Sequence, residues 1–308
     1  TNVEYLQEQY DIMEYFITNW DTYSYLRKTL SKIKDIEYLY RKIIFQKVEP
    51  NELYQFFNNL NSIYNIHQEL EKDETINTYI TNNINIDILT VCEKLKKTLT
   101  DNLNMNICKD LNNNKYEVNF MNIGVNDVLD EVVEKFEAIE KEKLDLCKLF
   151  DKYVNIGEGK GKTNENMTKI HVTEGGSMYI YLTSVRASHL KVGLEKENIT
   201  KYDIKYEKCK GTNKMLGGNV MKSFCQTYMQ KKSDLSQILK RVYQIFVEEL
   251  KNFDKEMFNF VDYVSLLDVI TAKSFVSKNE NYCKPTIRKK SKPYFDAEDL
   301  VHPILNHI

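Results

Sequence analysis

The sequence predicts a mainly α-helical fold, a helical bundle with one very long helix, into which a small antiparallel β-sheet is inserted. Three observations predict it. Nine of the ten glycines fall in 157–218, and the stretch between Pro50 and Pro285 contains no proline. On both sides of the glycine-rich stretch, apolar residues recur every three or four positions, as in amphipathic helices. Within that stretch they alternate with polar residues, as in strands.

The segments before the insertion are predicted to be helical. Apolar stripes at helical spacing predict helices over 3–20, 26–43, 50–64, 84–103 and 127–154. Pro50 suits the first turn of its helix, so 26–43 and 50–64 are expected to form a helical hairpin. The asparagine-rich stretch 110–126 is polar and predicts a loop.

The middle of the chain is predicted to form strands. Residues 169–185 alternate on both sides of a turn over 174–177, which is a β-hairpin signal. Residues 202–210 supply a third alternating strand. A small antiparallel sheet follows from these three strands.

The last helix is predicted to be the longest. From Leu235 to Phe275 the apolar residues step by three or four throughout, which predicts one helix over 233–278. About 45 residues make a rod on the order of 65–70 Å long, which would be a coiled-coil arm or a lever. The predicted domains are 1–156 for the first helical part, 157–232 for the β-containing insertion, 233–284 for the long helix and 285–308 for a linker.

The charges change where the secondary structure changes. Residues 157–232 contain 14 Lys and Arg against 7 Asp and Glu, whereas the remaining chain contains 29 and 38. The whole chain has a net charge of −2 and is no polycation. A nucleic-acid-binding role would therefore depend on the local charge of the insertion.

The composition narrows the class of protein. Of the 308 residues, 42% are hydrophobic and 29% are charged, which excludes a disordered chain. The longest apolar runs fall far short of the ~18 residues of a membrane span, and no cleavable signal pattern opens the chain. Six cysteines without CxxC spacing predict reduced thiols in an intracellular, reducing compartment, whether nuclear, cytoplasmic, viral or organellar. Neither they nor the five histidines, which lack HExxH spacing, predict a metal site.

Four motifs resemble the MutS DNA mismatch-repair family. SLLDVITAKSFVSKNENYCKP (265–285) is similar to a family helix end followed by its N-Y-x-x-P exit. DLVHPIL (299–305) is similar to the family's R-H-P motif, with Val301 where arginine is usual. IKDIEYLYRKIIFQKVEPNELYQF (33–56) resembles the family's helical hairpin, and VNDVLDEVVE (125–134) resembles its E-L-D-E-L motif.

The resemblance runs from about residue 5 to the C-terminus and is weakest in the insertion. It implies a helical lever domain carrying a small β clamp, between a mismatch-reading domain and an ATPase domain that both lie outside this chain. It also implies double-stranded DNA as a partner and a homo- or heterodimer of MutS-like subunits in the intact protein. ATP and magnesium would belong to the ATPase domain, to which 285–308 would begin the linker, and no cofactor is expected in this chain. Repair and recombination both stay open as roles.

No catalytic activity is predicted for this chain. GEGKGKT (157–163) resembles a phosphate-binding loop, but three residues separate Gly157 from Gly161 where that loop needs four, and no strand precedes it. The segment is instead expected to be a flexible basic hinge into the clamp. The order of residues along the chain supports no Ser-His-Asp or Cys-His arrangement.

Lysines of the insertion are the predicted DNA contacts. Their ammonium groups would reach phosphate oxygens from glycine-rich turns without reading sequence. The sequence shows neither aromatic residues interleaved with basic ones nor a recognition helix, so it does not predict readout of DNA bases. The predicted contacts are Lys160, Lys162, Lys191, Lys205, Lys208, Lys210, Lys214 and Lys222. The alternatives are that these lysines form a solvated face, and that the chain is a helical scaffold or coiled-coil interaction protein with no DNA role.

Overall fold

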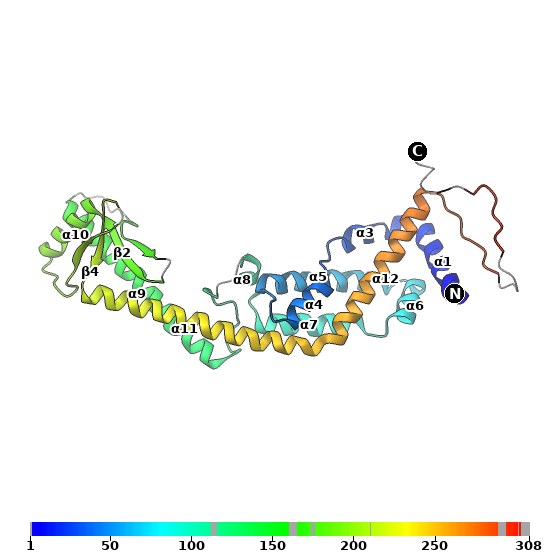
Figure 1. The fold of residues 1–308 in the computed structure, drawn as a ribbon, viewed down its shortest axis with the longest axis horizontal. Coiled ribbons are helices and arrows are strands. Elements are labelled where there is room, and N and C mark those ends of the chain that lie inside the picture. Colours follow the sequence, from blue (N-terminus) through cyan, green and yellow to red (C-terminus); the bar gives the residue numbers. More distant parts are fainter. Residues whose placement is uncertain are drawn as a thin grey trace. The chain divides into compact units, whose positions relative to one another are not determined.

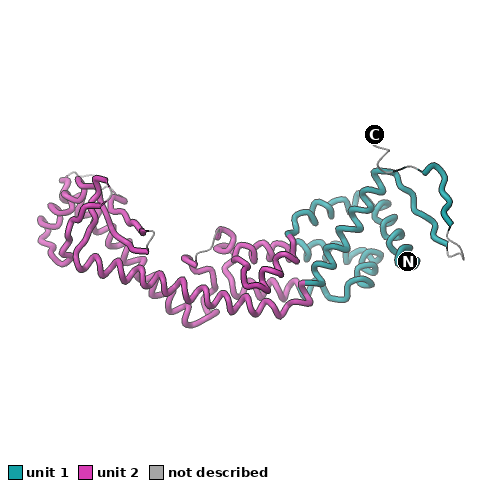
Figure 2. The backbone as a smooth tube through the Cα atoms, viewed as in Figure 1, with its two compact units in different colours: residues 1–34, 61–91, 258–308 teal, residues 35–60, 92–257 magenta. Residues whose placement is uncertain are grey.

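The computed structural model describes residues 2–111, 116–159, 165–173, 176–209, 211–288, 294–300 and 302. Within these residues the fold is mainly helical with one small four-stranded antiparallel sheet, which confirms the predicted fold class (Figure 1). The chain forms two compact units, each assembled from separate stretches (Figure 2). Unit 1 comprises 1–34, 61–91 and 258–308, and unit 2 comprises 35–60 and 92–257.

The first third of the chain is helical, but in more pieces than the sequence predicts. The helices before residue 111 are α1 (Val3–Thr18), α2 (Trp20–Tyr23), α3 (Tyr25–Leu30), α4 (Ile36–Ile44), α5 (Pro50–Leu70), α6 (Glu74–Asn83), α7 (Ile88–Asn102) and α8 (Met105–Asp110). The last helix of the chain is α12 (Asp254–Asn279). Pro50 is the first residue of α5, as predicted. The single helix predicted over 26–43 is wrong. Asp35 starts a new helix, α4, by accepting a hydrogen bond from the Tyr38 backbone N–H at 2.8 Å.

Unit 1 is built around buried aromatic side chains. Tyr263 is fully buried, and its hydroxyl lies 3.2 Å from Nδ1 of His67. The rings of Phe275 and Trp20 have centroids 5.8 Å apart, and the Arg27 guanidinium lies 3.6 Å from the centre of the Phe275 ring. Within unit 1, these contacts join α12 to α2, α3 and α5.

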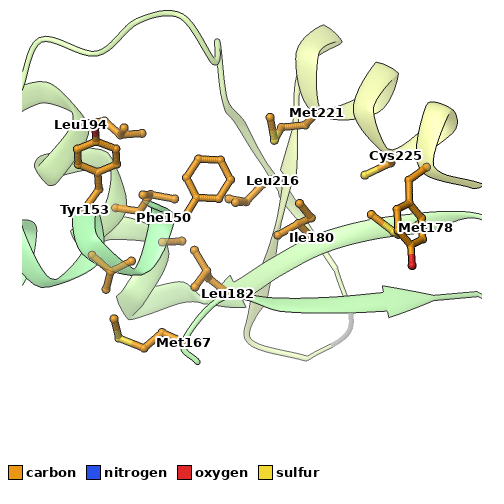
Figure 3. Close-up of a cluster of buried hydrophobic side chains, with 14 of the residues drawn as sticks. Phe150, Tyr153, Met167, Met178, Ile180, Leu182, Leu194, Leu216, Met221 and Cys225 are labelled. Atoms are coloured by element: carbon orange, nitrogen blue, oxygen red, sulfur yellow. The ribbon is translucent and has the colours of Figure 1, made fainter. Parts of the chain in front are cut away.

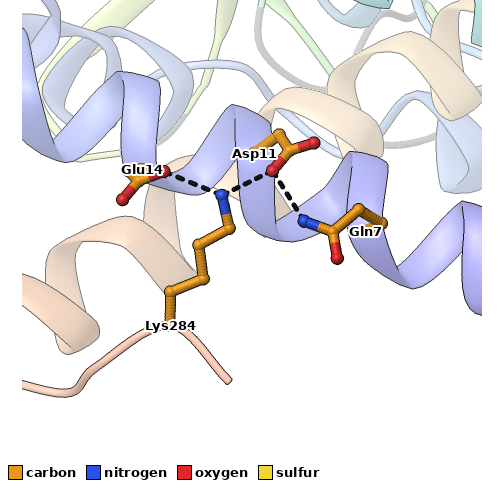
Figure 4. Close-up of polar contacts among 4 residues, drawn as sticks. All are labelled: Gln7, Asp11, Glu14 and Lys284. Atoms are coloured by element: carbon orange, nitrogen blue, oxygen red, sulfur yellow. Dashed lines mark hydrogen bonds and ion pairs between the residues drawn. The ribbon is translucent and has the colours of Figure 1, made fainter. Parts of the chain in front are cut away.

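The segment that follows α12 is held against α1 by a cluster of polar side chains (Figure 4). Lys284 Nζ lies 2.5 Å from Asp11 Oδ1 and 2.8 Å from Glu14 Oε2, and Gln7 donates a hydrogen bond to Asp11 at 2.9 Å. The hydrogen bond from Lys284 lowers the pKa of Asp11. Because surface ion pairs of this kind add little stability, the cluster mainly fixes where the chain leaves α12.

Asp73 of unit 1 is a carboxylate that accepts four hydrogen bonds. It caps α6 by accepting from the backbone N–H groups of Thr75 and Ile76, and it also accepts from the hydroxyls of Tyr15 and Tyr23. Burial alone would raise the pKa of Asp73, but these hydrogen bonds outweigh it and hold the pKa below its ordinary value. The carboxylate therefore contributes stability above the pKa of an unfolded aspartate and loses it as the pH falls through its own lower pKa.

Replacing Asp73 by asparagine should remove this acid-dependent stability. Asparagine still caps a helix, so the change tests mainly the charge. We expect the melting temperature of the parent to exceed that of Asp73→Asn at neutral pH, and the gap to shrink below about pH 4. Thermal melting from neutral pH into the acid range measures it, with Asp21→Asn, an exposed carboxylate of α2, as the control. A gap that stays constant with pH would contradict the assignment.

Unit 2 contains two long helices with a small sheet between them in the chain. The helices are α9 (Asp127–Glu158) and α11 (Asn219–Leu250), and they pack along each other. The elements between them are β1 (Lys169–Val172), β2 (Met178–Thr183), α10 (Ser184–Lys196), β3 (Lys205–Lys208) and β4 (Asn213–Gly217). The strand order is β1-β2-β4-β3, and all neighbours are antiparallel.

The sequence predicts part of this sheet. The β1–β2 hairpin and the β3 strand are confirmed, but α10 and β4 are not predicted. Residues 184–185, assigned to the hairpin by their alternation, instead open α10, where the Thr183 hydroxyl accepts a hydrogen bond from the Arg186 backbone N–H. The segment β4 is short and rich in turn residues, so its strand character comes from pairing with two neighbours.

The long helix also differs from its prediction. It begins at Asn219 rather than after Ser233, because the apolar stripe continues backward through Tyr228, Cys225 and Met221 into the core. It is not one helix to residue 278: a turn of 3-10 helix, η1 (Lys251–Phe253), separates α11 from α12. Asp254 accepts a hydrogen bond from the Lys255 backbone N–H at 2.7 Å at this point, and such side-chain bonds compete with helical ones.

Candidate nucleic-acid interface

The sheet and α10 form one module at the end of α9 and α11 (Figure 1). We call the described residues between α9 and α11, from residue 165 to 218, the sheet module. Its core is formed with both long helices (Figure 3). The central buried side chains are Phe150 and Tyr153 of α9, Ile180 and Leu182 of β2, Leu190 and Leu194 of α10, Leu216 of β4 and Met221 of α11.

The strand β2 shows which face of the sheet the helices cover. Met178, Ile180 and Leu182 are buried in the core, whereas Tyr179 and Tyr181 between them are partly exposed. The helices α10 and α11 contact β2, so they cover the side on which Ile180 lies. We call this side the helix face and the side of the two tyrosines the open face.

Two glycines let α9 and α10 cross at backbone contact. A Cβ atom on Gly157 would lie 1.9 Å from the His189 carbonyl oxygen, and one on Gly193 would lie 1.9 Å from the Tyr153 carbonyl oxygen. The expected flexible hinge at Gly157 is therefore wrong for that residue, which belongs to the last turn of α9. Residues 160–163 of the glycine-lysine sequence lie outside the described residues. Gly157 is explained by helix packing rather than by phosphate binding.

A buried carboxylate ties the start of the sheet module to α9. Asp151, which is 8% exposed, accepts hydrogen bonds from the backbone N–H groups of Met167 at 3.1 Å and Thr168 at 2.7 Å. It also accepts one from the Thr168 hydroxyl at 2.7 Å. Since Met167 and Thr168 directly precede β1, this carboxylate fixes where the first strand begins.

The predicted lysines that the structure describes do not form one patch. Lys160, Lys162 and Lys210 lie outside the described residues. Lys191 is exposed on α10, and Lys222 is exposed on α11, where it lies 3.5 Å from Glu207. Lys205 pairs with Gly217 and belongs to the open face, together with Glu207. Lys208 and Lys214 belong to the helix face.

Lys208 and Lys214 are direct cross-strand neighbours. They are paired in the register of β3 and β4, and Lys214 pairs in turn with Leu182 on β2. Among the described residues neither ammonium group has an ion-pair partner. Like charges directly opposite each other destabilise a sheet, and α10 begins two residues after Leu182 with the positive end of its dipole. A bound phosphate would relieve this repulsion.

The two long helices are joined by a polar network, and we call the pair α9 and α11 the shaft. Tyr228 donates a hydrogen bond to Glu140, which also pairs with Lys143, and Lys143 Nζ lies 3.2 Å from the Tyr228 hydroxyl. Burial and the Glu140 carboxylate raise the pKa of Tyr228, so its hydroxyl stays protonated and donates. Each helix has 32 residues, which gives a shaft about 48 Å long.

The open face carries an aromatic cluster that the sequence analysis did not identify. His171 and Tyr179 are cross-strand partners with ring centroids 5.0 Å apart, and the Tyr179 and Tyr181 centroids are 6.1 Å apart. The signal was the alternation of tyrosines in MYIYLT. It indicates a strand, but it does not say which side of that strand is covered.

The described residues offer neither a metal centre nor a membrane-spanning helix. Within the described part of the chain, no group of three or more His, Cys, Asp or Glu side chains could hold a metal ion. Among the same residues, no helix is both long and apolar enough to cross a membrane.

Comparison with known proteins places the chain in a family. A family model described as MutS domain III matches residues 1–274. The chain is also similar to a DNA mismatch repair protein, a mutS homolog of Acanthamoeba polyphaga mimivirus, with 21% identity over a 329-residue alignment. That alignment covers 100% of this chain and 28% of the viral protein, so the chain spans little more than a quarter of its relative.

Proposed function

Because this chain belongs to the MutS family, we propose that it is the lever and clamp of a DNA mismatch-repair protein. The sheet module is the clamp and binds the phosphates of duplex DNA without sequence preference. The shaft and α12 carry the position of the clamp toward an ATPase domain, which binds ATP and magnesium in the intact protein. This chain has no catalytic role of its own. In the intact protein, the clamps of two MutS-like subunits close around the duplex.

The observation that supports DNA contact most directly is the pair formed by Lys208 and Lys214. Two adjacent ammonium groups without an ion-pair partner among the described residues favour an anion spanning both. Phosphate oxygens along a DNA strand supply such anions, and lysine contacts to them carry no sequence information. Only a few such contacts are available on so small a module, which predicts an affinity of the order of micromolar or weaker.

The coupling role rests on the shaft. Its polar network spans α9 and α11, so the two helices respond to a displaced clamp together. The chain then continues from α11 through η1 into α12. The short 3-10 turn is the one interruption in this helical path, from 219 to 279 among the described residues, and it is where bending would concentrate.

Replacing Lys208 and Lys214 together by alanine tests the proposal. We expect the 308-residue chain to lose about tenfold or more in affinity for a short DNA duplex at low salt, equally for unrelated sequences. The slope of log affinity against log salt should become shallower by about 0.9 for each phosphate contact removed. Fluorescence anisotropy across a salt series measures both quantities.

A charge-matched control separates local contact from net charge. Lys97→Ala with Lys109→Ala removes two exposed positive charges from unit 2 outside the sheet module, and duplex affinity should change little. Adding Lys210→Ala and Lys222→Ala to the first variant extends the test to more of the predicted contacts. If the Lys208 and Lys214 variant binds duplex as tightly as the control variant does, the proposed contact is wrong.

A further inference from the structure

The open face of the sheet combines rings, an apolar side chain and lysines on one surface. Cross-strand register places Lys169 beside Tyr181, and Tyr181 beside Met215. His171 lies beside Tyr179. Tyr179, Tyr181 and Met215 belong neither to the buried core nor to the apolar residues packed against it. Their side chains are thus available to a ligand.

A pocket opens beside these rings. The strands β2 and β4 pair over 181–183 and 213–215. A pocket of about 550 Å³ lies between the ends of these strands and α11, with Tyr179 and Met215 at its edge. The helix-face residues Met178, Leu216, Met221 and Met229 line most of it, so it lies mainly on the helix side of the sheet. A space of this size with an aromatic and thioether lining accepts a flat, polarisable group.

The charges on this surface favour an anionic chain as the ligand. Lys169 and Lys205 are exposed on opposite edge strands of the open face, and neither has an ion pair among the described residues. The acidic side chain on this face, Glu207, is partly neutralised by Lys222 at 3.5 Å. The aromatic rings of the open face lie between the positive charges of Lys169 and Lys205. This arrangement is complementary to a polymer in which aromatic groups alternate with negative charges.

Single-stranded nucleic acid has this chemistry. Four-stranded sheets with aromatic side chains on an uncovered face stack two or three unpaired bases, and every base has a face that can stack. Duplex DNA offers no such faces, since its bases are already stacked on each other. Apolar peptides match the pocket but leave both lysines without partners.

We propose that the open face binds unpaired bases of single-stranded DNA, which stack on Tyr179, Tyr181 and His171 while their phosphates reach Lys169 and Lys205. This site lies on the opposite side of the sheet from Lys208 and Lys214, so it is distinct from the proposed duplex contact. The choice of DNA over RNA rests on the proposed function, whereas the stacking does not.

The decisive measurement compares two ligands that differ only in their bases. One is a fluorescent oligothymidine of about 20 nucleotides, and the other is an abasic deoxyribose-phosphate chain of the same length. Both carry the same phosphates, so the ratio of their affinities for the 308-residue chain isolates stacking. We expect oligothymidine to bind about tenfold or more tightly than the abasic chain.

Variants assign this preference to the rings. Replacing Tyr179 and Tyr181 together by alanine should bring the ratio close to one, while Tyr179→Phe with Tyr181→Phe should preserve it because phenylalanine still stacks. Tyr38→Ala, which removes an exposed tyrosine elsewhere in unit 2, should leave it unchanged. Amide hydrogen exchange of β2 and α10 verifies that the sheet module stays folded in each variant.

Four results would overturn the inference. The first is a ratio near one in the parent, which needs no variant and so cannot be blamed on misfolding. The second is an unchanged ratio in a folded alanine variant. The third is oligouridine binding without oligothymidine binding. The fourth is a parent dimer that the alanine variant dissociates while the ratio is near one, which would make the open face a contact between two copies.

The duplex test and this test can fail separately. The variant with Lys208→Ala and Lys214→Ala should lose duplex affinity and keep the preference for bases over the abasic chain. If duplex binding is absent from the parent but that preference is present, the proposed clamp function fails and the stacking site stands. If the parent binds duplex DNA but shows no preference for bases over the abasic chain, the proposed clamp function stands and the stacking site fails.

Discussion

Replacing Gly157 by alanine should destabilise unit 2 by about 3 kcal/mol, because the added methyl group meets backbone rather than a movable side chain. Its Cβ would lie 1.9 Å from the His189 carbonyl oxygen and 3.0 Å from the Gly193 nitrogen. The helices α9 and α10 would have to separate, which loosens the packing of Leu190 and Leu194 on α9. Urea unfolding and amide hydrogen exchange of α10 measure the effect.

Whether Gly157→Ala lowers or raises the stability of the chain shows whether α9 and α10 are in backbone contact. In a helix without a neighbouring backbone, alanine is more favourable than glycine by about 1 kcal/mol, so the same substitution would stabilise the chain. Gly193→Ala should be as damaging, because its Cβ would lie 1.9 Å from the Tyr153 carbonyl oxygen. Ser188→Ala, on the exposed side of α10, should change stability by less than about 0.5 kcal/mol. A stabilised Gly157→Ala chain would mean that the two helices do not touch.

Replacing Asp151 by alanine should cost about 3 kcal/mol, because it leaves two buried backbone N–H groups without an acceptor. Met167 is 2% exposed and Thr168 is 8% exposed, so water cannot readily replace the carboxylate. We expect the amides of these two residues to lose most of their protection from hydrogen exchange. The loss should spread into β1, whose first residue follows Thr168 directly.

Two control substitutions provide reference values for the loss of stability in Asp151→Ala. Thr168→Val removes only the hydroxyl hydrogen bond and should cost about 1 kcal/mol. Asp145→Ala removes an exposed carboxylate of the same helix and should be nearly neutral, within about 0.5 kcal/mol. If Asp151→Ala is no worse than Asp145→Ala, then the segment before β1 is held by something other than this carboxylate.

Helices with a continuous apolar stripe could be predicted from the sequence, and those made by tertiary contact could not. The helix α9 is found where its stripe predicts it, and Asn126 starts it by accepting a hydrogen bond from the Leu129 backbone N–H at 3.0 Å. The helix α10 contains Gly193, which disfavours a helix in isolation. That glycine is required by the crossing with α9, and such a requirement is visible only once both helices are placed.

The candidate sites, too, could be predicted from the sequence only in part. The excess of lysine in the insertion could be counted, but its distribution over two faces depends on strand register. Because β4 is not predicted, Lys214 cannot be recognised as the neighbour of Lys208. The alternation of Tyr179 and Tyr181 indicates a strand, yet it is the packing of α10 and α11 on the other side that leaves both rings uncovered.

The way the sheet module is inserted into the shaft sets an order for folding. Glu140 and Tyr228 touch across the shaft but are 88 residues apart in the chain. Closing so long a loop in the unfolded chain costs about 4 kcal/mol of entropy. The β1–β2 hairpin closes a far shorter loop and then gathers α10 and β4 around it.

We expect the near ends of α9 and α11 to fold together with the sheet module, whose core they share, before the rest of the shaft forms. The two helices can then zip up residue by residue, away from the sheet, at little further entropic cost. Substitutions within the module are expected to slow refolding, whereas substitutions in the far part of the shaft mainly accelerate unfolding.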